Sequence, residues 1–292
     1  MKRTVLALVL LSLVLLVLSC GASRRATSRK AIPQWMELPA ISSSDTESFF
    51  TSDMEIGGRM QRNYSYLYER ENLVSSWVAY PLTAENIGGN LKRTNTWGYD
   101  PLMPESEQQV LFRGYKEGNH GWYSRGHQIA SADRLYSVEC NTTTFRFTNM
   151  TPQNGDFNGG IWNNLEIKVR NWAKNCDTLY VVTGCVTKDS KYYALDNEGR
   201  KVTVPVASYK ALLAYRPSGK NAPSHAGYSG CAFFMPHEKD YQDGKVTREM
   251  YITIDELETL TGIDFFPLLE KKIGRKEAAA VEAETPSPSW WK

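Results

Sequence analysis

The sequence carries almost no excess of charge of either sign. Its 292 residues include 34 lysines and arginines against 32 aspartates and glutamates. Two of these bases, Lys2 and Arg3, lie within the first twenty residues, where there is no acid, so the rest of the chain is balanced at net zero. Overall charge therefore gives no support to nucleic-acid binding, and any positive potential that serves it must be local.

An apolar run long enough to cross a membrane is also missing. Residues 4–19 are almost wholly apolar, but they fall short of the ~20 residues that a spanning helix needs. A basic start, an apolar run and a small-residue end are the layout of a secretion signal, and Val17-Leu18-Ser19-Cys20 resembles the end of a bacterial lipoprotein signal. We therefore expect residues 1–20 to direct export. A lipidated Cys20 would then anchor the protein to a membrane of the bacterial cell envelope, facing the periplasm or the cell surface. An ordinary cleaved signal or a retained anchor helix is the alternative.

Cysteine is scarce, and no C-x-x-C pair occurs, which argues against a zinc site. Besides Cys20, the chain contains Cys140, Cys176, Cys185 and Cys231. An even number of cysteines in an exported chain predicts disulfides. Four cysteines allow three pairings, between which the sequence does not choose, and free buried thiols are the alternative.

Compositional bias is confined to the two ends of the chain. Residues 21–45 are rich in Ser, Ala, Arg and Pro, which predicts a tether between the membrane and the folded part. Residues 271–292 are charged and then rich in proline and serine, which predicts a mobile tail. Residues 46–270 contain no internal repeat and are long enough for one domain with a sizeable core.

Strand patterns are frequent within this domain. Alternating or β-branched segments predict strands at 74–80, 144–148, 178–186, 202–206, 211–215 and 232–235. The segment 178–186 is apolar enough to be buried on both faces.

Helix patterns are fewer. A helix is predicted over 158–173, where apolar residues recur at helical spacing. A second is predicted over 254–260, with Thr253 and Glu256 as a capping box at its start. Because strands outnumber helices and do not alternate with them, we expect an α+β domain built on an antiparallel sheet.

Of the four histidines, His127 is distinguished by its neighbours. Gly126 directly before it permits unusual backbone angles or the close approach of a ligand. Arg125 would face the same way as His127 in an extended strand. An imidazole can take a proton from water, and a guanidinium can hold phosphate oxygens with paired donors. The pair suits phosphodiester hydrolysis, although an isolated strand histidine is more often structural.

Two polar residues in the predicted helix 158–173 could serve the same chemistry. In a regular helix Asn158 and Glu166 would be offset by ~80° and ~12 Å, so both cannot bind one ion directly. Asn158 could bind a metal ion while Glu166 holds one of its waters, an arrangement that suits Mg²⁺. The alternative is that Asn158 caps the helix and Glu166 is a solvated surface charge.

The segments SRGHQ at 124–128, TNMTPQ at 148–153 and FNGGIWNNLE at 157–166 together resemble the DNA/RNA non-specific endonuclease family. Flanking pieces agree, namely WVAYPL at 77–82, LYVVTG at 179–184 and ELETLTGIDFF at 256–266. The resemblance covers residues 65–269. It implies that the antiparallel core carries a ββα-metal (His-Me) finger.

The resemblance also implies an activity and a role for each residue. The activity is metal-dependent hydrolysis of DNA and RNA to 5′-phosphate products, with Mg²⁺ or Mn²⁺ as cofactor. His127 is implied as the general base, Asn158 as the metal ligand and Glu166 as a residue that acts through water. Arg125 is implied as a phosphate contact, and the best candidate for a second, upstream arginine is Arg93. Nucleic acids are the expected partners, together with a membrane through Cys20, and no protein partner is expected.

Two positions depart from the family pattern. Ser124 replaces the usual Asp, and Ala130 replaces a Pro. If that Asp orients the histidine, activity could be reduced or lost, which keeps open a catalytically decayed nucleic-acid-binding lipoprotein. A serine hydrolase around Ser229 is a further alternative, but Cys231 breaks its G-x-S-x-G pattern. A purely structural surface lipoprotein is the last.

Overall fold

The computed structural model describes residues 32–219, 222–237, 239–241 and 244–284. The expected export signal, lipidated Cys20 and the first part of the tether lie outside the described residues, as does the end of the predicted tail. Within the described ranges, none of the helices combines the length and the apolar character that crossing a bilayer requires.

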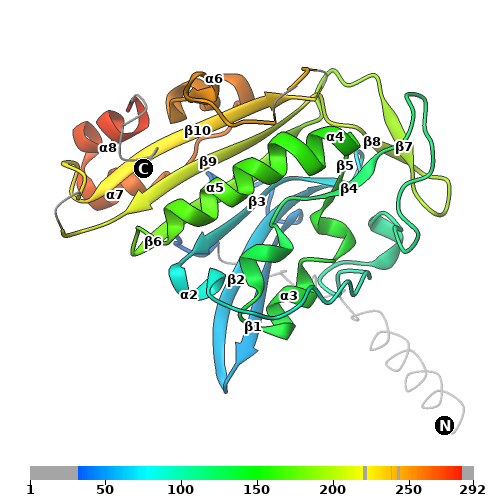
Figure 1. The fold of residues 1–292 in the computed structure, drawn as a ribbon, viewed down its shortest axis with the longest axis horizontal. Coiled ribbons are helices and arrows are strands. Elements are labelled where there is room, and N and C mark those ends of the chain that lie inside the picture. The colour runs from blue at the N-terminus through cyan, green and yellow to red at the C-terminus, as the bar shows by residue number, and fades with distance from the viewer. Residues whose placement is uncertain (1–31, 220–221, 238, 242–243, 285–292) are drawn as a thin grey trace, which may run out of the picture. The chain divides into compact units, whose positions relative to one another are not determined.

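An antiparallel sheet of seven strands forms the centre of the described domain (Figure 1). Its strands lie in the order β1 (Phe49–Ile56), β2 (Arg59–Glu69), β3 (Val74–Leu82), β6 (Thr178–Val186), β9 (Ala207–Tyr215), β10 (Tyr228–Pro236) and β11 (Tyr251–Ile252). This confirms the predicted α+β class with an antiparallel core.

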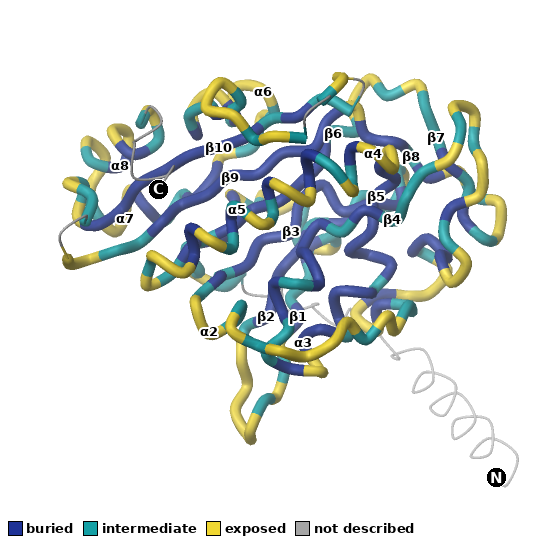
Figure 2. The backbone as a smooth tube through the Cα atoms, viewed as in Figure 1, coloured by how far each residue is buried: buried dark blue, intermediate teal, exposed yellow. Residues whose placement is uncertain are grey.

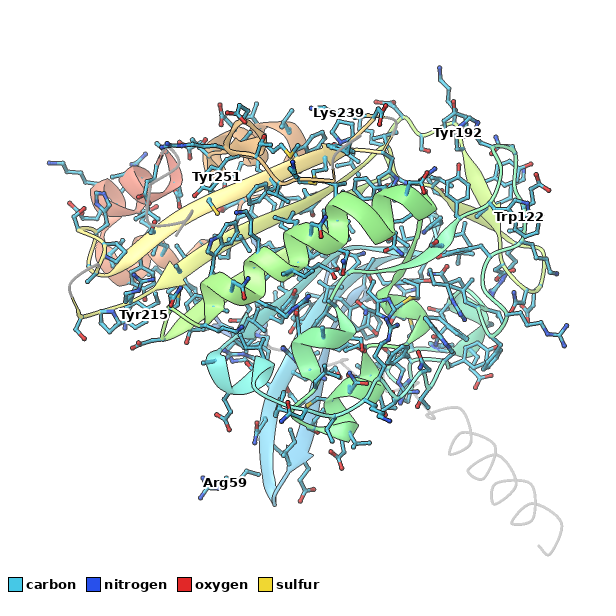
Figure 3. All side chains as sticks on the ribbon, in the orientation of Figure 1. Arg59, Trp122, Tyr192, Tyr215, Lys239 and Tyr251 are labelled. Carbon is cyan, nitrogen blue, oxygen red and sulfur yellow. The ribbon has the colours of Figure 1, made fainter. Side chains whose placement is uncertain are left out.

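Both faces of the sheet are covered by helices, so its central strands are buried (Figure 2). Helix α5 (Asn163–Ala173) packs on one face, and side chains fill the space between it and the strands (Figure 3). Helices α6 (Ile254–Thr261), α7 (Leu268–Ile273) and α8 (Arg275–Glu282) pack on the other face. Neighbouring residues of β6 point to opposite faces, with Val181 toward α5 and Val182 toward α6 to α8.

Two short hairpins lie outside the main sheet. Strand β4 (Ser124–His127) pairs with β5 (Met150–Gln153), and β7 (Tyr193–Leu195) pairs with β8 (Lys201–Thr203). Directly after β5 the chain forms α4 (Gly155–Phe157), the π-helical turn η4 (Asn158–Trp162) and then α5. This is the ββα unit that the resemblance predicted. The remaining short elements are α2 (Ala84–Ile87), η1 (Glu105–Glu107), η2 (Ser131–Arg134), α3 (Val138–Thr143), η3 (Phe147–Asn149) and η5 (Arg248–Met250).

The predicted strand at 144–148 is wrong. This segment turns after α3, makes a single bridge from Arg146 to Gly98 and continues into η3. Its apolar alternation has another cause, because Phe145 packs edge-on against Trp97 while Phe147 packs against Tyr99. The strand expected at 202–206 ends at Thr203, whereas those expected at 211–215 and 232–235 are the ends or centres of longer strands.

The tail predicted from Lys271 onward is also corrected. Helix α8 buries Ala278 and Val281 against the sheet. Beyond it, the Glu284 carboxylate accepts hydrogen bonds from the Ser229 hydroxyl at 2.7 Å and the Gly230 backbone N–H at 3.1 Å. The chain is therefore part of the packed domain as far as Glu284.

The four cysteines that the structure describes are free, which corrects the prediction of disulfides. Cys140, Cys185 and Cys231 are buried in different places, and Cys176 is half-buried. Three of the thiols hydrogen-bond elsewhere, since Cys140 contacts the Tyr136 hydroxyl, Cys176 donates to the Trp172 carbonyl and Cys185 donates to the Ser75 carbonyl. The even number of these cysteines therefore does not reflect disulfide bonds between them.

Candidate active site

Strand β4 presents His127, and its hairpin with β5 explains the glycine before it. His127 lies opposite Met150 and Gly126 lies opposite Thr151. A Cβ atom on Gly126 would come within 2.2 Å of the Gln153 side-chain oxygen, so any other residue here would displace that buried side chain. The group that closely approaches Gly126 in the structure is therefore the Gln153 side chain.

The His127 ring lies between two aromatic side chains. Ring centroids are 5.7 Å from Trp97 and 5.3 Å from Phe145, both in edge-on geometry. One ring nitrogen hydrogen-bonds to the Arg125 backbone, whereas the buried Nε2 atom has no hydrogen-bond partner in the described part of the chain. A buried polar atom without a partner is unusual in a folded protein and points to a missing water or ligand.

Burial, together with the positive charges of Arg93 and Arg125, lowers the pKa of His127 to about 3. The imidazole is therefore neutral at neutral pH, with a lone pair free on one nitrogen. That is the protonation state a general base needs.

Two contacts fix the Arg125 guanidinium beside this ring. Its central carbon lies 3.5 Å from the centroid of the Trp97 ring, and Nη1 donates to the Leu111 carbonyl at 2.8 Å. Burial lowers the pKa of Arg125. A guanidinium has five N–H donors, so donors remain for an anion.

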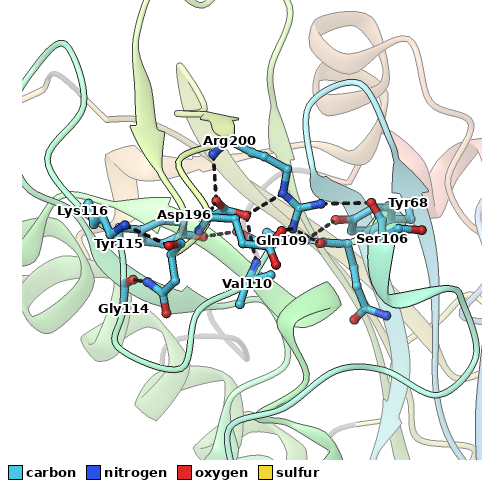
Figure 4. Close-up of polar contacts among 12 residues, drawn as sticks. Tyr68, Ser106, Gln109, Val110, Gly114, Tyr115, Lys116, Asp196 and Arg200 are labelled. Carbon is cyan, nitrogen blue, oxygen red and sulfur yellow. Dashed lines mark hydrogen bonds and ion pairs between the residues drawn. The ribbon is translucent and has the colours of Figure 1, made fainter.

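The residues just before Leu111 are held by a buried polar network (Figure 4). The fully buried Asp196 carboxylate accepts from the Val110 N–H at 3.1 Å and from Arg200 Nε at 2.9 Å. Arg200 also donates to the Gln108 carbonyl. The turn between β7 and β8 thereby fixes the loop that orients Arg125.

Arg93 is exposed, and its positive charge acts on the other titratable residues of the predicted site. Its guanidinium carbon lies 5.2 Å from the Phe145 ring centroid. Its charge lowers the pKa of His127, of Arg125 and of Glu166. The structure therefore brings these four residues of the predicted site within electrostatic reach of one another.

Asn158 does not cap its helix, which corrects the structural alternative for this residue. The cap is Asn154, whose side chain accepts from the backbone N–H groups of Asp156 and Phe157. Asn158 opens η4, and its carboxamide makes no hydrogen bond with any residue in the described ranges. Inside η4, Gly160 has φ −97° and ψ −106°, so the regular-helix offset assumed between Asn158 and Glu166 does not hold.

Glu166 is not a freely solvated surface charge. Burial raises its pKa to about 7, against the opposing charge of Lys210. Lys210 is almost fully buried, donates to the Thr183 hydroxyl at 2.7 Å and lies 4.7 Å above the Trp162 ring.

The sequence analysis missed the charged groups beneath α5. Arg170 Nη1 lies 3.1 Å from Asp133, which also accepts from the Tyr80 hydroxyl at 2.9 Å. These residues and Lys210 come from distant segments, so spacing could not group them. The one available signal was a lysine inside the apolar strand segment ASYKALLAY at 207–215.

Asn149 is a second residue that sequence reasoning passed over. Its side-chain oxygen accepts from the Ile129 N–H at 2.9 Å, and its amide donates to the carbonyls of Ile129 and Thr144. It therefore fixes the chain that leaves His127. Its place in TNMTPQ was the signal.

The described residues contain no group of three or more His, Cys, Asp and Glu side chains able to hold a metal ion. An ion at this site would need few protein ligands and several waters, which suits Mg²⁺ or Mn²⁺ better than zinc. The unpartnered carboxamide of Asn158, on the same helical segment as Glu166, fits that requirement.

Comparisons with known proteins agree with this geometry. The sequence model of the family described as DNA/RNA non-specific endonuclease matches residues 46–272. The human mitochondrial nuclease EXOG is 28% identical over 236 residues, which are 77% of this chain and 61% of that protein. A nuclease from Nostoc sp. is 30% identical over 207 residues, which are 70% of this chain and 72% of that protein.

The fold is likewise similar to a solved structure. A crystal structure of the EndoG/EndoGI complex aligns with a TM-score of 0.57 at 24% identity, covering 74% of this chain and 87% of that one. The chain spans about three fifths of the length of the vertebrate EXOG nucleases it matches.

Proposed function

Because the chain belongs to the DNA/RNA non-specific endonuclease family, we propose that it is a metal-dependent endonuclease acting on both DNA and RNA. One observation carries this proposal, namely a neutral imidazole with an unpartnered nitrogen beside two arginines. These are the groups that hydrolysis of a phosphodiester requires at one place.

His127 acts as the general base. Its free ring nitrogen accepts a proton from water as the water oxygen attacks phosphorus and the bond from phosphorus to the 3′ oxygen breaks. The product then carries a 5′-phosphate. A bound phosphate neutralises the charges of Arg93 and Arg125, which raises the pKa of His127 and makes it a stronger base when substrate is present. Because water and not the 2′-hydroxyl attacks, ribose and deoxyribose both serve.

Arg125 and Arg93 bind the phosphate oxygens and stabilise the charge that develops in the transition state. Such contacts address the backbone and not the base edges, so they give little sequence preference.

The family nucleases depend on a metal ion. Asn158 would hold it through the carboxamide oxygen, with Glu166 facing its water, and Mg²⁺ or Mn²⁺ suits that donor set. When bound, the ion supplies positive charge next to the departing 3′ oxygen.

A decayed nucleic-acid binder is the second candidate, and Ser124 is the observation that favours it. The Ser124 hydroxyl makes no hydrogen bond within the described ranges, so it does not orient His127. The Arg125 backbone makes the hydrogen bond to the ring instead, which supports an active enzyme.

For location, we propose export and anchoring through a lipidated Cys20 at the bacterial cell envelope, on the strength of the sequence of residues 1–20 alone.

The test is cleavage of supercoiled plasmid and of RNA by the purified protein, in Mg²⁺ or in chelator. We expect both substrates to be cut in Mg²⁺ and neither in chelator, and the fragments to carry 5′-phosphates. His127→Ala, purified in the same way, controls for contaminating nuclease and should lose at least about a hundredfold in rate while keeping its circular dichroism spectrum. Equal cleavage by the variant would overturn the proposal, and DNA retention without cleavage would favour the decayed binder.

A further inference from the structure

A cavity of about 1280 Å³ lies next to the ββα unit and has no part in the chemistry described so far. Five segments line it, namely residues 120–123 before β4, residues 154–164 around η4, residues 189–192 between β6 and β7, residues 204–206 between β8 and β9, and residues 236–237, 239–241 and 244 at and after the end of β10. His127, Asn158 and Glu166 are not among its lining residues.

The cavity is nevertheless close to the site. Phe157 and Gly159 line it, and they flank Asn158 in the chain. Tyr123, which also lines it, directly precedes β4. Cavity and catalytic groups therefore share one helical segment.

Aromatic rings dominate the end of the cavity nearest β4. Trp122 is 67% exposed, although a side chain of this size is normally covered. His120 stacks on Tyr192 with ring centroids 4.0 Å apart and planes 15° apart. Figure 3 shows Trp122 and Tyr192 at the same end of the molecule, beside β7. Flat exposed rings of this kind are what unpaired nucleobases stack on.

Charges of both signs line the cavity. Asp156 and Asp189 line it, and their carboxylates repel phosphate but accept hydrogen bonds from base amino and imino groups. Lys191 and Lys239, also lining residues, can attract the backbone nearby. In a duplex these base edges are already paired and stacked, so only an unpaired base can use the cavity.

We propose that this cavity is a binding subsite for an unpaired nucleobase next to the scissile phosphate, with Trp122 as its stacking platform. This inference rests on the proposed function, because it assigns the bound strand to the same site. It predicts that the protein binds single strands more tightly than duplexes through Trp122, while the backbone contacts of Arg93 and Arg125 serve both.

The test uses the cleavage-deficient His127→Ala protein in chelator, so that binding is measured without turnover. A fluorescently labelled oligonucleotide is titrated as a single strand, as a duplex and as an abasic strand with the same phosphates. Adding Trp122→Ala should raise the Kd for the single strand about tenfold, which is the loss of roughly one base stack. The Kd values for duplex and abasic strand should change less than about twofold.

Two further variants control for fold and exposure. Trp122→Phe keeps a ring and should lose less than about threefold. Met60→Ala, on the β1–β2 hairpin, removes an apolar side chain that is equally exposed at 67% and should change no Kd. Figure 3 labels the neighbouring Arg59 far from Trp122.

Two results would overturn the subsite. One is an equal rise in Kd for single strand, duplex and abasic strand, which would make Trp122 a general contact. The other is no change for the single strand. The enzyme proposal fails separately, if the wild-type protein binds single strands through Trp122 but cuts no nucleic acid in Mg²⁺.

Discussion

Burial lowers the pKa of both His127 and His237, yet only one of the two is suited to catalysis. Burial is the largest cause of the lowered pKa in both, to about 3 for His127 and about 4 for His237. Both also lie near aromatic rings, since the His237 centroid is 4.7 Å from that of Phe157. A lowered pKa therefore does not distinguish the two.

The residues around the two rings do distinguish them. Nε2 of His237 is 2.9 Å from the Ser208 hydroxyl, which in turn accepts from the Gln153 amide at 3.3 Å. Each ring has one buried nitrogen without a partner among the described residues, Nε2 in His127 and Nδ1 in His237, but only His127 is next to two arginines. Perturbed titration marks buried groups in general, and charge partners suited to the substrate are what mark a site.

The largest expected effect separates the two histidines by rate. His127→Gln should lower plasmid cleavage about a thousandfold, because no base remains. His237→Gln keeps a polar partner for Ser208 and leaves the general base in place, so it should lose less than about tenfold, although His237 lines the proposed base subsite. Initial rates of supercoiled plasmid nicking, at matched protein concentration, measure both. Similar losses in the two variants would erase the distinction drawn between them.

The next largest effect concerns the pKa, which burial lowers in both histidines. The unfolded His237 side chain takes up a proton below its ordinary pKa of about 6.5, whereas the folded one stays neutral until about pH 4. Its contribution to stability is therefore complete above pH 6.5 and is lost as pH falls toward 4.

The His237→Gln variant lacks this pH-dependent contribution to stability. The free energy of unfolding of wild type, relative to the variant, should fall by about 2 kcal/mol between pH 7 and pH 4.5. Urea denaturation at both pH values measures it. A difference that does not change with pH, or that grows on acidification, would show that His237 is not buried as a neutral ring.

The smallest effect tests the neighbours of His127. Arg125→Lys keeps the charge but loses the planar stack on Trp97 and the paired donors, so kcat/KM should fall roughly twentyfold. Arg113→Lys, an exposed arginine two residues after Leu111, is the matched control and should leave kcat/KM unchanged. Equal values for the two variants would mean that positive charge alone suffices at position 125.

The sequence grouped the candidate site residues but misassigned the segment between them. His127, Arg125 and Asn158 could be proposed because each lies in a short motif that carries its own chemistry. A strand was wrongly predicted at 144–148, because burial of Phe145 and Phe147 on different sides of a bend imitates strand alternation. The strand that pairs with β4, namely β5, contains Pro152, a residue that argues against a strand except at the edge of a sheet.

Features that depend on tertiary contacts could not be predicted from spacing. The π-helical turn at Gly160 changes the relation of Asn158 to Glu166, and a regular helical period cannot reveal it. The pairing of Glu166 with Lys210 depends on where β9 lies in the sheet. The segment of helix α8 was predicted to be a tail because it is rich in charged residues. The two apolar residues that it buries, Ala278 and Val281, are too few to produce a clear pattern in the sequence.

The contacts that fix the Arg125 side chain affect its affinity for the phosphates of a substrate. A free arginine side chain has about 2 kcal/mol of rotamer entropy, which is lost whenever the side chain is ordered on binding. Here the Trp97 ring and the Leu111 carbonyl have ordered it before any substrate arrives. Phosphate binding therefore does not cause this loss of entropy. The guanidinium is already oriented when a nucleic acid of any sequence reaches the site.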